Sequence, residues 1–143
     1  MTVHNNIENI LNKIANISGG SPPAFDDDGR CVLEIQDISI LLEASSQSNS
    51  CLLMSIVYRG PPHLEIFKEA LSGNLYWNKT KGCTLMWENS SNSLILCLEK
   101  QSETLDFQTF TQSLSDFHTA AHLWLETCQR IQEETQNSAI KHF

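Results

Sequence analysis

The sequence is short of positive charge. It holds 9 lysine and arginine residues against 17 aspartate and glutamate residues, and its formal net charge is −8. Contacts to nucleic-acid phosphates and to anionic lipid head groups depend on clustered basic side chains. The sequence therefore argues against nucleic acid and against a membrane surface as partners, and an acidic chain of this kind suits neutral or basic partners.

Long apolar runs are also missing. No segment approaches the run of about 18 apolar residues that is typical of a membrane-spanning helix. The N-terminus has no basic stretch followed by an apolar one, which is the pattern of a secretory signal. A chain of 143 residues is long enough for one domain with a core. We therefore expect a cytoplasmic protein with one domain over residues 1–136 and a disordered tail over residues 137–143.

Catalytic motifs are missing as well. The five cysteines form no C-x-x-C pair, and most lie in apolar runs where a thiol behaves as a small buried hydrophobe. This pattern favours reduced thiols over a disulfide framework. Neither the glycine-rich phosphate loop nor the G-x-S-x-G turn of a serine nucleophile occurs. The sequence favours a binding module without catalytic activity and without a cofactor.

Two polar clusters could hold a metal ion, but both lack part of the necessary pattern. His118, His122 and Glu126 follow one another at four-residue intervals, which is a possible zinc spacing. The zinc-protease motif would need Glu at position 119, which is Thr. The turn Asp26–Gly29 resembles a calcium loop but lacks its spacing and terminal Glu. We expect no metal site, and a small enzyme or metal protein built around His118 and His122 remains the least favoured alternative.

A long amphipathic pattern runs from Phe107 to Ile131. Its apolar residues recur at steps of three and four, and a helix places such residues on one face. A period this regular could also form a coiled coil. Because phenylalanine and tryptophan are untypical of a coiled-coil seam, we favour a helix that covers a sheet. The apolar stripe consists of Phe107, Phe110, Leu114, Phe117, Ala121, Trp124, Cys128 and Ile131.

Shorter patterns precede this helix. An apolar face predicts a helix over residues 3–17, and a second begins after Pro61-Pro62, with Gly73 as its left-handed cap. Short loops between the strand patterns imply antiparallel pairing. The expected fold is α+β, in the order α-β-β-β-α-β-β-α, with an antiparallel twisted sheet packed by helices. The strands are expected at residues 31–36, 37–44, 51–58, 83–88 and 94–100.

Two apolar faces have no evident cover in the sequence. The first helix either docks on the sheet or helps to form a groove. The second helix, Leu64 to Leu71, lies between two sheet segments and could be covered by another subunit. Ordinary core packing is the alternative for both helices.

Four local motifs, in this order, make the chain resemble the class I chaperones of type III secretion, the Tir-chaperone (CesT-like) family. The resemblance covers nearly the whole chain. The second hairpin and the final helix are most similar to the chaperones of plant-pathogen effectors, although Trp87-Glu88 stands where many members carry a small or aliphatic residue and then Asp. The motifs are Phe25 with Asp28–Ile35, Ala70–Leu75, Lys81–Trp87 with Leu94–Leu98, and Leu105-Asp106 with Phe110, Leu114 and Phe117.

The resemblance implies a cytoplasmic homodimer that binds the N-terminal segment of a secreted effector and keeps it soluble, non-globular and competent for secretion. A disordered segment of this kind can add a strand to a sheet edge and fill apolar grooves. A non-enzymatic adaptor or regulator of a secretion system with the same fold is the alternative. The effector groove would involve Ile7, Ile10, Leu11, Ile14, Leu33 and Ile35. The dimer contact would involve Leu64, Phe67, Leu71, Cys83, Leu85 and Trp87.

Overall fold

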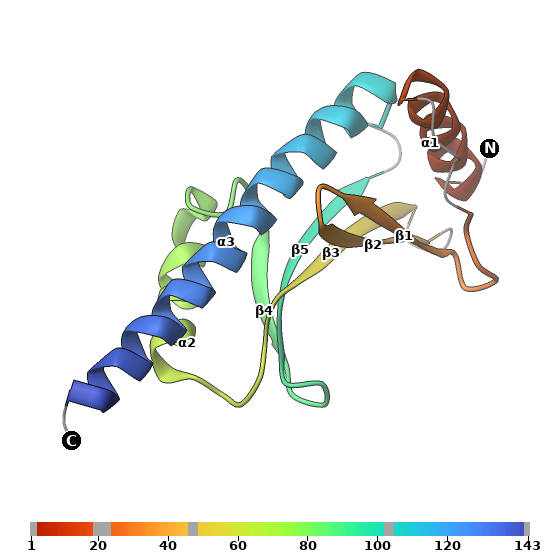
Figure 1. The fold of residues 1–143 in the computed structure, drawn as a ribbon. Coiled ribbons are helices and arrows are strands. Elements are labelled where there is room, and N and C mark those ends of the chain that lie inside the picture. The colour runs from red at the N-terminus through yellow and green to blue at the C-terminus, as the bar shows by residue number, and fades with distance from the viewer. Residues whose placement is uncertain (1–2, 19–23, 46–48, 102–104, 142–143) are drawn as a thin grey trace.

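The computed structural model describes residues 3–18, 24–45, 49–101 and 105–141. Its element order confirms the expected α+β fold, with each strand close to its expected place (Figure 1). Within these ranges, no helix combines the length and the apolar character needed to cross a bilayer. The elements are α1 (Val3–Ser18), β1 (Arg30–Ile35), β2 (Ile38–Ser45), β3 (Ser50–Arg59), α2 (Leu64–Asn74), the 3-10 turn η1 (Leu75–Trp77), β4 (Thr84–Glu88), β5 (Ser93–Gln101) and α3 (Phe107–Lys141).

The five strands form one antiparallel sheet in the order β1-β2-β3-β5-β4. The sequence analysis expected Gln36 at the end of one strand and Asp37 at the start of the next. Instead, the two residues form the tight turn between β1 and β2, with φ of 47° and 67°. Positive φ at both central residues is the geometry of a type I′ hairpin. In Figure 1, α3 crosses the sheet diagonally, α1 lies near β1 and β2, and α2 lies beside α3.

The core lies on one face of the sheet. Side chains along the strands alternate between buried and more exposed, as in β2 from Ile38 to Ser45. The buried set joins residues from all three helices in a single cluster. In α3 the predicted stripe packs into that cluster, and Phe110, Phe117 and Trp124 are almost completely buried. The stripe therefore covers the sheet, as predicted, and is not a coiled-coil seam.

The two ends of α3 are defined differently. Asp106 precedes the helix, and its carboxylate accepts a hydrogen bond from the Thr109 N–H at 2.7 Å while the Thr109 hydroxyl accepts one from the Asp106 N–H at 2.9 Å. These reciprocal bonds satisfy donors that a helix start leaves free. At the other end the chain remains helical to Lys141, where a disordered tail was expected, and residues 142–143 lie outside the described ranges.

Gly73 does not cap α2 in a left-handed conformation, so that prediction is wrong. It lies inside the helix and is buried, and a Cβ at this position would stand 2.4 Å from Cζ2 of Trp124. The left-handed residues come later, at Tyr76 (φ 59°) and Trp77 (φ 57°). Gly73 is present because α2 and α3 approach closely there, which leaves no room for a side chain.

Candidate functional site

The sheet face that points away from the helices carries apolar side chains, and we call it the open face. Three of these side chains are largely exposed: Val32 (55%), Ile56 (42%) and Met86 (41%). An antiparallel sheet with one solvated face normally alternates apolar and polar residues, with the polar ones outward. An apolar outer face of this extent is typical of a surface that receives a partner. The remaining apolar members, all half-buried, are Leu41, Leu52, Met54, Ile95 and Cys97.

Strand register places the residues of the open face in continuous rows. Directly paired residues on neighbouring strands have side chains close enough to touch. One row crosses the whole sheet, and a second, shorter row runs beside it. The first is Val32–Leu41–Met54–Cys97–Thr84, and the second is Ile56–Ile95–Met86.

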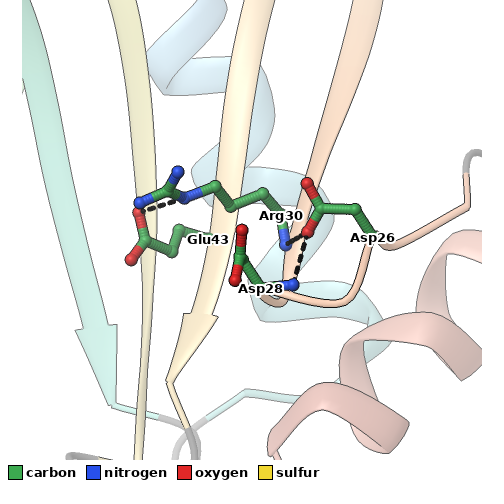
Figure 2. Close-up of polar contacts among 4 residues, drawn as sticks. All are labelled: Asp26, Asp28, Arg30 and Glu43. Atoms are coloured by element: carbon green, nitrogen blue, oxygen red, sulfur yellow. Dashed lines mark hydrogen bonds and ion pairs between the residues drawn. The ribbon is translucent and has the colours of Figure 1, made fainter.

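Charged and polar pairs border the rows on β1 and β2. Arg30 Nε lies 3.4 Å from the carboxylate of Glu43, and on the other side of the first row the Ser39 hydroxyl donates to Glu34. Figure 2 shows the Arg30–Glu43 pair and the turn beside it, where the Asp26 carboxylate accepts hydrogen bonds from the N–H groups of Asp28 and Arg30. The Asp26–Gly29 turn is therefore a structural turn that sets the start of β1. On β1 and β2 the apolar rows therefore have a polar border, as the core of an interface has a polar rim.

The residues predicted for the effector groove lie elsewhere, between α1 and the helix-covered face. Ile7, Ile10, Leu11 and Leu33 are buried in the core, and Ile14 and Ile35 pack partly against it. Of the two possibilities for the first helix, the structure shows docking on the sheet. Direct contact of these six residues with an effector stays a prediction.

The residues predicted for the dimer contact fall into two groups. Leu64 and Leu71 project from α2 and are 70% and 72% exposed. Cys83 and Leu85 are buried in the core. Phe67 and Trp87 lie between these extremes and pack edge to face, with ring centroids 4.8 Å apart. The structure thus brings Phe67 and Trp87 together and leaves the outer side of α2 without cover in the described chain.

Three exposed apolar residues continue this surface beyond α2, and none of them is among the residues predicted for the dimer contact. Leu75, Tyr76 and Trp77 are 64%, 77% and 54% exposed. We call Leu64, Leu71, Leu75, Tyr76 and Trp77 the α2 surface. The sequence signal was a short apolar stretch, and the structure shows that this stretch forms the 3-10 turn η1 on the surface.

Hydrogen bonds hold the end of the α2 surface in place. The side chain of Asn74 donates to the Leu85 carbonyl at 3.0 Å and accepts from the Leu85 N–H at 2.8 Å. The Trp77 carbonyl accepts from the Gly82 N–H at 3.0 Å, and Trp124 Nε1 donates to the Lys79 carbonyl at 3.1 Å. A left-handed aromatic residue costs free energy that the surrounding contacts must offset. These contacts supply that support, so the exposed rings stand on a fixed turn.

The cysteines do not have the chemistry of nucleophiles. Burial raises the pKa of the Cys31, Cys83 and Cys128 thiols to about 11 and that of Cys51 to about 12. Burial also raises the pKa of the partly buried Cys97. Only the thiolate attacks, and these groups stay protonated near neutral pH. The five thiols are free and serve as packing groups in this fold.

The histidines on α3 make separate contacts. His118 Nε2 lies 3.0 Å from the Ile35 carbonyl, at the end of β1, whereas His122 pairs with Glu126 at 3.0 Å on the solvent side. His118 thus links the β1–β2 hairpin to α3. In the described parts of the chain, no group of three or more His, Cys, Asp or Glu side chains is arranged to hold a metal ion.

Comparisons with known proteins agree with this geometry. The profile of the Tir chaperone protein (CesT) family matches residues 9–125. No curated protein sequence matches the chain. Among solved structures, the ExsC–ExsE complex contains a chain with a TM-score of 0.74 at 18% identity, covering 88% of this chain and 96% of that one.

Two further structures share the fold at similarly low identity. The HopA1–SchA chaperone–effector complex gives a TM-score of 0.72 at 20% identity, with 86% of this chain and 95% of that chain covered. The ExoT–SpcS complex from Pseudomonas aeruginosa gives 0.61 at 15%, with 84% and 95% covered. At such identities the structural likeness establishes the fold.

Proposed function

Because the chain belongs to the Tir chaperone protein (CesT) family, we propose that it is a type III secretion chaperone that acts as a homodimer in the cytoplasm. It binds the N-terminal chaperone-binding segment of a cognate effector. The bound segment stays soluble, non-globular and ready for secretion. The protein has no catalytic activity and needs no cofactor.

The open face is the observation that carries this proposal. Its longer row runs across all five strands and its shorter row across three, so an unfolded segment laid over them can bury apolar side chains along a broad surface. A segment that binds in this way covers much area at modest affinity per unit area and has no folded core of its own. Solved chains that share the fold include one in a chaperone–effector complex, which supports the same role for this chain.

The α2 surface supports the dimer. Leu64 and Leu71 are the most exposed leucines of the chain's helices and sit on a helix held firmly by core contacts at Ile66 and Ala70. Tyrosine and tryptophan supply large contact areas and are over-represented where interfaces carry most of their energy. A second copy that covers Leu71, Tyr76 and Trp77 would remove this apolar surface from water.

The two surfaces can be tested with one matched set of variants. The tagged protein is captured from its own source under secretion-inducing conditions, and the partner is identified. Ile56→Asp places a charge in the open face and should weaken effector binding by at least about 2 kcal/mol, roughly thirtyfold in Kd. Leu71→Glu should yield monomers in sedimentation velocity. Leu123→Asp, at an exposed leucine on α3 outside both surfaces, is the control and should change neither property.

Circular dichroism must show that all three variants remain folded. An effector that binds Ile56→Asp as well as the unchanged protein would contradict the open face as the binding surface. An unchanged dimer mass for Leu71→Glu would contradict the dimer contact. Capture of many unrelated proteins, or of none, would favour the adaptor or regulator instead of the chaperone.

A further inference from the structure

Two carboxylates stand at opposite ends of the open face. Glu34 comes two residues after Val32 on β1, and a spacing of two keeps both side chains on one face of the strand. Glu88 comes two residues after Met86 on β4 in the same way. Both carboxylates are exposed, and neither forms an ion pair with a residue of the described ranges. Because β1 and β4 are the two outer strands of the sheet, the apolar surface has a free negative charge at each end.

Neighbouring hydroxyl groups orient the two carboxylates. The Ser39 hydroxyl donates to Glu34, and the Ser90 hydroxyl donates to Glu88 at 2.8 Å. A hydroxyl donor fixes the direction of a carboxylate but leaves its charge uncompensated, and the carboxylate can accept further hydrogen bonds. Each end of the open face therefore presents an oriented acceptor that a cation of a partner can pair with.

The two arginines that border the open face do not neutralise these ends. Arg30 is already paired with Glu43, as Figure 2 shows. Arg59 lies at the end of the central strand β3, and its Nε donates to the Ser93 hydroxyl at 3.4 Å. The border thus has one unpaired cation near its middle and one unpaired carboxylate at each end.

We propose that the partner segment that crosses the open face carries a lysine or arginine at each end of its apolar stretch, with neutral residues between. The inference rests on the proposed chaperone function and specifies the sequence that this face recognises. From β1 to β4 there are four strand spacings, about 19 Å in all, and an extended chain covers that distance in about six residues. The two basic residues therefore lie about six positions apart, one beside Glu34 and the other beside Glu88.

The electrostatics of binding favour this charge pattern. Burial of apolar side chains can supply affinity, but it does not discriminate between segments of similar hydropathy. A segment that covers Val32 and Met86 removes water from the carboxylates beside them, and this loss is offset only if the segment supplies a cation. An acidic segment would also be repelled by a chain of net charge −8. Basic residues at both ends of the segment satisfy these conditions, and Arg59 disfavours a basic residue in its middle.

Protection of the sheet edges is the competing explanation for Glu34 and Glu88. Charged side chains on outer strands hinder the pairing of one sheet edge with another. A charge of either sign has this effect, so replacement of both residues by lysine would preserve the protection. Recognition of a basic segment depends on the sign of the charge, so the same replacement would reverse the preference for the partner. Charge reversal therefore separates the two explanations.

The test uses the full-length protein and defined peptides in place of an effector. Three fluorescein-labelled peptides share a middle of alternating leucine and serine and are compared by fluorescence anisotropy. The first has lysine at both ends, about six residues apart, the second has glutamate at both ends, and the third has both lysines at one end. We expect the first to bind about tenfold more tightly than the second, because two attractions replace two repulsions, and about threefold more tightly than the third. High salt should reduce both differences, since the charges are exposed.

Matched double variants locate the charges that matter. Glu34→Lys with Glu88→Lys should reverse the preference, so that the peptide with glutamate ends binds more tightly. Glu133→Lys with Glu134→Lys makes the same change of net charge at exposed positions near the end of α3 and should keep the original preference. Circular dichroism must show that the variants are folded. Glu34→Gln with Glu88→Gln, which changes the shape of the side chains least, should abolish the preference and provides the test if the lysine variant does not fold.

Several results would overturn the proposal. They are equal binding of the lysine and glutamate peptides, a preference that charge reversal leaves unchanged, self-association of the reversed variant without a change in preference, and no binding at the highest soluble concentration. Ile56→Asp separates this inference from the proposed function. If that variant loses the peptides while the preference does not depend on Glu34 and Glu88, the open face remains the binding surface and only the charge pattern is wrong. If Ile56→Asp binds the peptides unchanged, the open face itself is contradicted.

Discussion

Substitution of Gly73 by alanine should destabilise the protein, although alanine normally favours a helix. A Cβ at this position would lie 2.4 Å and 2.5 Å from Cζ2 and Cη2 of Trp124. Carbon atoms in contact are normally about 3.5–4.0 Å apart, so the indole or α2 must move by about 1 Å. The indole has little freedom, because Trp124 is 3% exposed and its Nε1 donates to the Lys79 carbonyl.

The size of the effect follows from three contributions. Overpacking a core typically costs about 1–3 kcal/mol. Displacement of the indole would also weaken a hydrogen bond that contributes about 1 kcal/mol. Alanine gains about 1 kcal/mol over glycine in helix propensity. The expected net loss in the free energy of unfolding is about 2 kcal/mol, which lowers Tm by about 8 °C for a chain of this size.

Thermal and urea denaturation of three variants would measure this loss. Ser72→Ala, at the exposed neighbouring position of α2, controls for helix propensity and should be neutral or slightly stabilising. Trp124→Phe removes the ring atoms that the new Cβ meets, so in that background Gly73→Ala should cost at least about 1 kcal/mol less. A rise in Tm for Gly73→Ala, or an equal cost in both backgrounds, would refute the reasoning.

Two further predictions concern pH. Hydrogen bonds from Thr109 lower the pKa of Asp106 below its usual 3.8. The stabilising effect of the Asp106 carboxylate is therefore present above pH 3.8 and is lost as the pH falls through the lowered pKa. Asp106→Ala should lower Tm at pH 7, and the difference from the unchanged protein should vanish in strong acid. Burial raises the pKa of Cys51 from 9.0 to about 12, so the native state keeps the neutral thiol and loses stability as the pH rises above 9.0. Iodoacetamide at pH 8 should label Cys51 in urea but not in the native protein, and rapid native labelling would contradict its burial.

Periodicity predicted the elements whose packing is regular. The three-and-four spacing of α3 is unambiguous because the helix has one buried face, and Phe110, Phe117 and Trp124 lie on that face in the structure. The strands of the hairpins could be predicted for the same reason, because they too have one buried face. The family resemblance was also visible from ordered local motifs, and the match over residues 9–125 confirms it.

The sequence could not separate the two faces of β3. Its stretch from Cys51 to Tyr58 is apolar at nearly every position, which predicts a central strand, and the strand is central. A strand with apolar residues on both faces fits two situations. Helices of the same chain can cover both faces of the sheet, or helices can cover one face and a partner the other. Only the three-dimensional arrangement shows that the helices lie on the side of Leu53 and Val57 and leave Met54 and Ile56 outside.

Backbone conformation was the other feature without a sequence signal. Tyrosine and tryptophan have no preference for positive φ, so nothing at Tyr76 or Trp77 predicts a left-handed turn. Glycine does have that preference, and this is why Gly73 was expected to be the cap. Its actual constraint is the indole of Trp124, a residue more than fifty positions away, and such a contact is visible only in the folded chain.

The two proposed interfaces lie on opposite sides of the sheet, and this arrangement has a consequence for binding. The open face points away from the helices, whereas Leu64 and Leu71 project outward from a helix on the other side. An effector on one side therefore need not displace a second copy on the other, and a dimer would offer two open faces to one continuous segment. Because the two sites share no residues, the effect of Ile56→Asp and the effect of Leu71→Glu on the affinity of a single protomer for the effector should be additive. The dimer gains through effective concentration, since a segment bound to one open face is held near the other, so Leu71→Glu should reduce the overall affinity for a long effector far more than for a short peptide.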